Sequence, residues 1–274
     1  YNQPMREAMY GWLDLWLRGR GDGSPVPEPP IEAEDPEAIR CYPDAASRPA
    51  TIVSIPEFSH REAQARLAAL PPAPDHREAW EAQAVSLRDS LEKKVLGGFP
   101  QAAPRPGRIA FDADRRLWSF DVEAEPGITL TGYASAPAAN GAPARGLVVL
   151  ADDQVVDPDS AVGLSRPWTE AGYATCAVEL RALGRRKPET SAVGEALDHN
   201  EAEWGVWLGR PLLGQWVFDL LQWLKAVDLL RDRPPSGFPT MLRNAPKLLH
   251  GRGAAGTAAL LAAGFDPEVE TTVA

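Results

Sequence analysis

The chain has 274 residues, of which 44% are hydrophobic and 24% charged, an ordinary composition for a globular protein. Its formal net charge is −10, and its basic residues form only short groups such as Arg185-Arg186-Lys187. Binding to phosphates needs clustered positive charge, so we expect neither a nucleic acid nor an anionic membrane surface as a partner. No apolar stretch approaches the roughly 18 residues that cross a bilayer, and no signal peptide is recognisable.

The first predicted element is a helix over residues 4–18. Gly19, Gly21 and Gly23 follow it, and a proline-rich, acidic connector then runs over residues 20–49, where we expect a domain junction. The chain opens directly in this helical pattern, lacks an initiator Met, and stops just after a strand-like segment. We therefore expect it to be a piece of a longer protein. The helix has one apolar face, formed by Met5, Met9, Trp12, Leu13, Trp16 and Leu17.

The next region, residues 50–106, is predicted to be a helical hairpin. It begins with TIVSIPEF, which is either strand-like or the start of a loop. Two helical patterns then cover residues 60–70 and 77–98, separated by PPAPDH, with Gly97 and Gly98 as the C-terminal stop of the second.

From Arg115 onwards the hydrophobic pattern indicates strands alternating with helices. Residues 117–125 and 128–137 alternate around Pro126-Gly127 as in a hairpin. Such alternation predicts an α/β domain over residues 107–274, with a mostly parallel sheet and right-handed crossovers. Its other expected strands are 146–153, 173–184, 245–251 and 266–274, and its expected helices are 160–172, 213–227 and 254–264.

The stretch HGRGAAG, His250 to Gly256, has two interpretations. The spacing of Gly251, Gly253 and Gly256 matches the dinucleotide fingerprint G-x-G-x-x-G. That motif normally occupies the first strand-to-helix turn of its sheet and is followed about 20 residues later by an acidic residue. Here several strands precede it, and the acidic residues at 266, 268 and 270 come too early. Dinucleotide binding is therefore the second interpretation.

The first interpretation is a nucleophile elbow, G-x-S-x-G, as in α/β-hydrolases. The stretch follows several predicted strands and one long helix, which is where that elbow belongs. Gly253 then stands in place of the nucleophilic serine, and Ala255 replaces the second glycine of the motif. The catalytic residues of such enzymes occur in the order Ser, Asp or Glu, His, and no histidine follows Gly253. No catalytic triad can be assembled at these positions.

Four segments resemble bacterial acetyl-xylan-esterase-like and related α/β-hydrolase proteins: REAWEAQAVSLRDSLEKKVLGGFP, PGITLTGYASAP, HNEAEWGVWLGRPLLGQWVFDLLQWL and LLHGRGAAGTAALLAAGFDPEV. The similarity is greatest to the second hydrolase-like half of large two-domain members. The opening residues 1–19 are similar to the C-terminal helix of the preceding hydrolase domain. The resemblance implies an incomplete hydrolase-type sheet in this chain, and a parent protein that hydrolyses carboxylic esters, with carbohydrate esters as its substrate class. It allows export of the parent and implies no cofactor.

Other candidate sites have simpler explanations. His199, with Glu201 and Glu203, could form an acid/base or metal cluster, but the spacing matches no metal signature. Asp152 and Asp153 end a predicted strand, where α/β folds bind ligands. A turn or helix cap explains these two carboxylates better than a paired-acid centre, and we expect no metal.

One serine and four tryptophans are further candidates. Ser165 lies in a sequence that resembles half an elbow but precedes a strand, so a helix or surface serine is expected. Trp216 and Trp223 fall on or beside the apolar stripe of the long helix and are expected in the core or in packing between domains. Trp204 and Trp207 are the better candidates for exposure and for stacking against a sugar.

These observations predict a chain that is inactive alone. It would be a non-catalytic hydrolase-like domain that packs against a preceding catalytic hydrolase domain of the same polypeptide or shapes its cleft. One alternative is a competent enzyme, with its nucleophile elsewhere or with further sequence that completes this sheet. The other is a dinucleotide-binding domain. The sequence leaves open whether Cys41 and Cys176 pair.

Overall fold

The computed structural model describes residues 2–44, 46–137, 144–187, 199–234 and 245–274. Contacts divide the chain into two compact units, Tyr1–Pro72 and Ala73–Ala274. In the described part of the chain, no helix is both long and apolar enough to cross a membrane. Cys41 is exposed and Cys176 buried, and both are free thiols.

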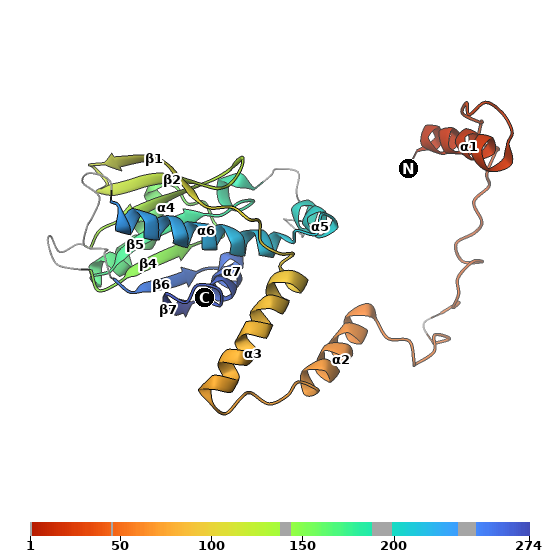
Figure 1. Cartoon of the computed structure of the whole chain (residues 1–274). Coiled ribbons are helices and arrows are strands. Elements are labelled where there is room, and N and C mark those ends of the chain that lie inside the picture. The colour runs from red at the N-terminus through yellow and green to blue at the C-terminus, as the bar shows by residue number, and fades with distance from the viewer. Residues whose placement is uncertain (1, 45, 138–143, 188–198, 235–244) are drawn as a thin grey trace. The chain divides into compact units, whose positions relative to one another are not determined.

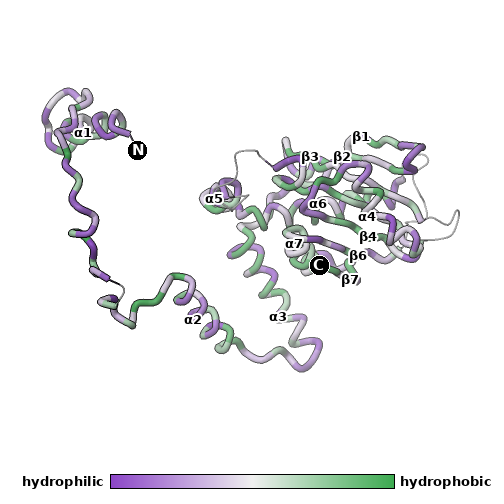
Figure 2. Tube along the Cα trace, turned by 180° about the vertical axis from the view of Figure 1, so that it is seen from behind, coloured by the Kyte–Doolittle hydropathy of each residue, from purple (hydrophilic) through white to green (hydrophobic). Residues whose placement is uncertain are grey.

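Helix α1 (Gln3–Arg18) confirms the first predicted helix. The Asn2 side chain caps its N-terminus, and Gly19, with a left-handed φ of 64°, ends it. The following residues run back along the helix: the Val26 amide donates to the Glu7 carbonyl at 3.0 Å. The connector beyond them is mostly hydrophilic, as predicted (Figure 2).

Helix α2 (Ile55–Ala68) corrects one sequence interpretation. The strand-like or loop reading of residues 51–58 is wrong from Ile55 onwards, because the Ser54 side chain accepts from the Glu57 amide and Pro56 fits the first turn. The helix has no buried residue. It therefore contributes nothing to a core within its own unit.

Helix α3 (Arg77–Ser90) opens the second unit and continues into a π-helical turn, η1 (Leu91–Val95). The left-handed φ angles of Gly97 and Gly98, 78° and 77°, confirm the predicted stop. The boundary between the units falls between α2 and α3. The predicted helical hairpin of residues 50–106 crosses that boundary, so its arrangement stays a prediction.

The second unit contains a seven-stranded sheet (Figure 1). Three junctions are antiparallel, β1–β2, β2–β3 and β3–β5, and the other three are parallel. The predicted α/β class is confirmed, but the sheet is mixed and not mostly parallel. In spatial order its strands are β1 (Arg105–Asp112), β2 (Leu117–Glu125), β3 (Ile128–Ser135), β5 (Ala174–Glu179), β4 (Leu147–Ala151), β6 (Lys247–Gly251) and β7 (Val269–Val273).

Strand β1 is the one strand of this sheet that the sequence analysis did not predict. Pro106 and Gly107 interrupt its pattern, and most of its side chains are exposed, so no alternation of apolar and polar residues marks it. It pairs with β2 along one edge of the sheet.

Helices cover both faces of the sheet. Residues of α6 (Leu212–Asp232) and α7 (Ala254–Ala263) form one apolar cluster with Val149, Val178 and Leu249. Residues of α4 (Pro158–Glu170) form the other with Val148 and Leu150. Two short helices, η2 (Gly184–Arg186) and α5 (His199–Trp207), lie between β5 and α6 in the chain.

The predicted environments of the four tryptophans are confirmed. Trp216 and Trp223 of α6 are buried, and Trp223 stacks on Phe120 of β2 with ring centroids 4.5 Å apart. Trp204 and Trp207 of α5 are exposed. The long helix α6 thus supplies the centre of the core, and the stacking candidates lie outside it.

Candidate functional site

The candidate site lies at the C-terminal edge of the parallel strands. The chain leaves β4 through α4 towards β5, and leaves β6 through α7 towards β7, on the opposite side. Because β4 and β6 are neighbours and their connections diverge, this edge is a topological switch point, where α/β folds bind ligands. The loop after β4 and the turn after β6 therefore face each other across the switch point.

The turn after β6 has the geometry of a sharp strand-to-helix elbow. Gly253 adopts φ 59° and ψ −135°, a combination that side-chain-bearing residues rarely adopt, and α7 begins at the next residue. Gly251 is also constrained, because a Cβ there would lie 2.6 Å from Gly256 Cα. Close packing of the helix on the strand thus accounts for the glycine spacing without a bound ligand.

Asp153, from the loop after β4, fills the place of a nucleophile at this elbow. A Cβ on residue 253 would overlap the Asp153 carboxylate. The same carboxylate accepts a hydrogen bond from the Ala254 amide at 3.1 Å. In a hydrolase elbow, the amide of the residue after the nucleophile belongs to the oxyanion hole. Here an internal carboxylate takes that donor.

Asp153 is held in its ionised form. Hydrogen bonds from the Gln154 side chain, at 2.8 Å, and from the Ala254 amide lower the pKa of Asp153 below its usual range, and Arg252 adds to this effect. Partial burial opposes the shift. A carboxylate at the N-terminus of α7 also interacts favourably with the helix dipole. Asp153 therefore acts as a cap for α7, supplied from another segment of the chain.

Asp152 has a different environment from its neighbour. It is buried, accepts from the Gln154 amide at 2.9 Å, and lies 3.3 Å from the Arg252 guanidinium. Asp152 thus closes the loop turn while Asp153 caps a helix. These contacts agree with the predicted turn and cap.

The other predicted candidates are not among the contacts of the elbow. His199 lies at the start of α5 and is 3.3 Å from Glu203 on the same helix, with both side chains partly exposed. Ser165 is buried in α4, where it accepts from the Thr175 hydroxyl at 2.8 Å. Within the described ranges, no group of three or more His, Cys, Asp or Glu residues could hold a metal ion.

His250 is a feature of this edge that sequence analysis did not single out. It lies on β6 and faces the side of the sheet that α4 covers, with its ring 5.5 Å from the Trp168 ring. Burial, and then the nearby Arg252, lower the pKa of His250, so the imidazole is neutral at pH 7. The available signal was a histidine near the end of the short run KLLHG.

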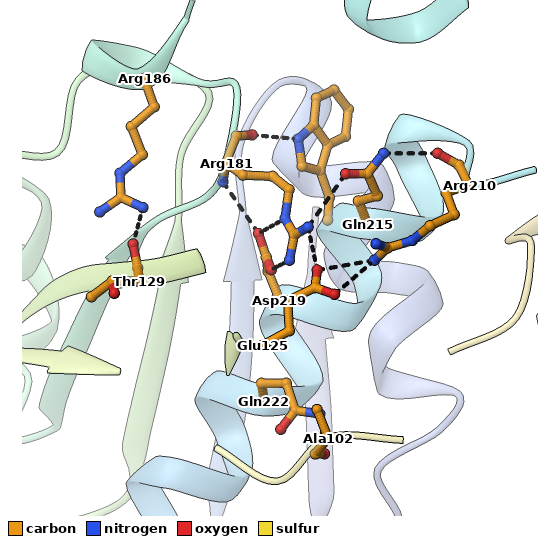
Figure 3. Close-up of polar contacts among 10 residues, drawn as sticks. Ala102, Glu125, Thr129, Arg181, Arg186, Arg210, Gln215, Asp219 and Gln222 are labelled. Carbon is orange, nitrogen blue, oxygen red and sulfur yellow. Dashed lines mark hydrogen bonds and ion pairs between the residues drawn. The ribbon is translucent and has the colours of Figure 1, made fainter. Parts of the chain in front are cut away.

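A largely buried charged network, shown in Figure 3, lies at the C-terminal ends of β2 and β5. Arg181, which follows β5, donates to Asp219 of α6 at 2.8 Å and to Glu125 of β2 at 2.5 Å. Glu125 also accepts from Arg210 at 2.9 Å, and the Arg181 carbonyl accepts from the Trp216 indole at 2.8 Å. The network joins two strands to α6 and is a structural clamp.

Comparisons with solved structures identify the fold of the chain. A solved protein from Bacteroides fragilis, assigned as an acetyl xylan esterase, superposes with a TM-score of 0.54 at 14% identity, over 80% of this chain and 60% of that one. The chain has an α/β-hydrolase fold. It spans about 60% of the length of that hydrolase.

Other solved α/β-hydrolases are similar at lower scores. An acetyl xylan esterase from Paenibacillus sp. R4 has 16% identity and a TM-score of 0.44, over 74% of this chain and 60% of that one. A glucuronoyl esterase from Solibacter usitatus has 16% identity and a TM-score of 0.47, over 73% and 59%. No family model and no curated protein matches the chain.

Proposed function

We propose that the chain is a non-reactive hydrolase-fold region of a larger carboxylic ester hydrolase. The observation that carries this proposal is the Asp153 carboxylate, which lies where a serine at residue 253 would need to place its side chain. Acyl transfer by a triad requires a nucleophile, a base within hydrogen-bond reach and free donors for the oxyanion. The elbow lacks the first, and Asp153 occupies one of the donors.

The esterase class of the parent is part of the same proposal. It is supported by the fold shared with a protein assigned as an acetyl xylan esterase, and by the sequence segments that resemble such proteins. Carbohydrate esters are the substrate class that this name suggests. The hydrolase-fold region would then support the catalytic one or shape its cleft.

The proposed partner is a preceding catalytic hydrolase domain of the same polypeptide. The arrangement around α1 supports this partner. The residues that follow α1 run back along it, and Ser24 packs against the side of the helix that carries Gly11. Glu28 accepts a hydrogen bond from the Tyr10 hydroxyl at 2.7 Å. The apolar face predicted from sequence is left exposed within its unit, with Trp12 57% and Trp16 67% exposed. Such a face suits packing against another apolar surface.

The dinucleotide alternative is not favoured. Its pyrophosphate would have to approach the N-terminus of α7, where the ionised Asp153 would repel it. We expect no change in melting temperature on adding millimolar NAD, NADP or FAD, because ligands stabilise a fold only through preferential binding to the native state. Thermal unfolding followed by circular dichroism tests this expectation. A saturable upward shift would restore the dinucleotide interpretation.

The main test is hydrolysis of 4-nitrophenyl acetate by the purified chain. We expect its hydrolysis rate to equal that of the heat-unfolded chain, because loss of a triad lowers turnover by about 10⁶-fold. Gly253→Ser should not create activity, because the new side chain meets Asp153 and has no base. The double variant Asp153→Ala/Gly253→Ser removes the overlap and should also stay inactive.

The same variants test the geometry independently of activity. Gly253→Ser should destabilise the chain by about 1–3 kcal/mol through overlap with Asp153 and backbone strain. The cost should be smaller in the Asp153→Ala background, where only the strain remains. Saturable esterase activity that is lost on mutating His199 or Ser165 would contradict the proposal. Activity gained by Gly253→Ser alone would show that a base already faces the elbow.

A further inference from the structure

A pocket of about 680 Å³ opens beside the elbow, between α4 and the ends of β4 and β6. Its walls combine apolar side chains, among them Leu164, with the rings of Trp168 and His250. Neither Gly253 nor Asp153 lines it. The pocket is therefore separate from the occupied nucleophile position, although both lie at the switch point.

The charges that line the pocket cancel. Asp152 contributes one negative charge and Arg252 one positive charge, and these two groups lie 3.3 Å apart. His250 adds no charge at pH 7, because burial lowers its pKa. A ligand with a net charge would meet one attractive and one repulsive group of equal size. The pocket thus favours an uncharged ligand.

Unused hydrogen-bonding capacity gathers at the same wall. One oxygen of Asp152 accepts from the Gln154 amide and the other pairs with Arg252, which still leaves acceptor positions on the carboxylate. No hydrogen bond to either ring nitrogen of His250 is found within the described part of the chain. A neutral imidazole has one donor and one acceptor nitrogen. A hydroxyl group, which both donates and accepts, matches this wall.

We propose that this pocket binds an uncharged aromatic compound carrying a hydroxyl group, of the size of a substituted phenol. The ring would lie against Trp168, His250 and the apolar side chains, and the hydroxyl would face Asp152 and His250. Small-molecule sites commonly have this composition, with mostly apolar walls and a few convergent polar groups. Binding needs no reaction at the elbow, so it goes beyond the proposed function and can be tested separately from it.

The test is a titration of the whole chain with 4-methylphenol, followed by the NMR signal of the His250 ring. We expect a saturable shift with a Kd on the order of 1 mM, as suits a ligand of few atoms in an open pocket. Three probes that share the methylphenyl group serve as controls: toluene, 4-methylbenzoate and 4-methylbenzylamine. Each should bind at least tenfold more weakly, the first for want of a hydroxyl and the others because of their charge.

Gly163, which lines the pocket from α4, offers a matched pair of variants. A Cβ there would meet no atom within 4 Å, so both Gly163→Ala and Gly163→Phe should fold. The phenylalanine should project into the pocket and weaken 4-methylphenol binding at least tenfold, whereas the alanine should leave it unchanged. Equal binding of the charged probes, unchanged affinity in Gly163→Phe, or no saturable shift would each overturn the proposal.

Discussion

Replacing Asp219 with alanine should lower the free energy of unfolding by about 3–5 kcal/mol, because the buried charge of Arg181 loses a carboxylate partner. Asp219 is fully buried, and its carboxylate accepts from the backbone amide and the guanidinium of Arg181. Without it, Arg181 keeps only part of its compensation, from Glu125 and Gln215. Urea unfolding followed by tryptophan fluorescence measures the loss.

An exposed ion pair provides the matched control. Asp14 pairs with Arg18 on the surface of α1 at 3.1 Å, and Asp14→Ala should cost no more than about 0.5 kcal/mol. The double variant Asp219→Ala/Arg181→Met should be less destabilised than Asp219→Ala alone, because it also removes the Arg181 charge that has lost its partner. If Asp219→Ala lowered the free energy of unfolding no more than Asp14→Ala does, the charged network would not stabilise the fold as proposed.

Replacing Trp223 with alanine should also cost about 3–5 kcal/mol, through lost burial and the cavity that remains. The side chain is fully buried, stacks on Phe120, and lies so close to Gly132 that a Cβ at that glycine would overlap it. The same measurement on Trp207→Ala, at a tryptophan that is 72% exposed, should change stability by less than about 0.5 kcal/mol. Similar losses of stability in the two variants would show that Trp223 does not lie at the centre of the core.

Trp223 and Asp219 connect α6 to strands that end at the edge of the sheet where the candidate site lies. Trp223 packs α6 against β2, and Asp219, one turn earlier on α6, holds the residue that follows β5. Both contacts fix strands whose C-terminal ends lie at the switch-point edge. We therefore expect stability changes at α6 to reach the loop conformations at that edge.

The sequence by itself determined most of the helices and strands, since their signals are local. Gly19 ends α1 and Gly97 ends η1 because glycine adopts the left-handed backbone that these ends need. The spacing of apolar residues in α6 predicted its buried stripe, and short apolar runs predicted β4, β5 and β6. The absence of a serine at residue 253, and of any histidine after it, was likewise readable directly.

Only the tertiary structure decided which distant groups meet. Asp153 and Ala254 are 101 positions apart, and no local pattern links a loop carboxylate to the amide that it caps. Strand β1 became a strand through pairing with β2, despite Pro106 and Gly107. The Arg181–Asp219 clamp likewise depends on a crossover that returns α6 to the end of β5. Local sequence determines backbone preference and periodicity, whereas strand order and long-range packing determine which side chains share a site.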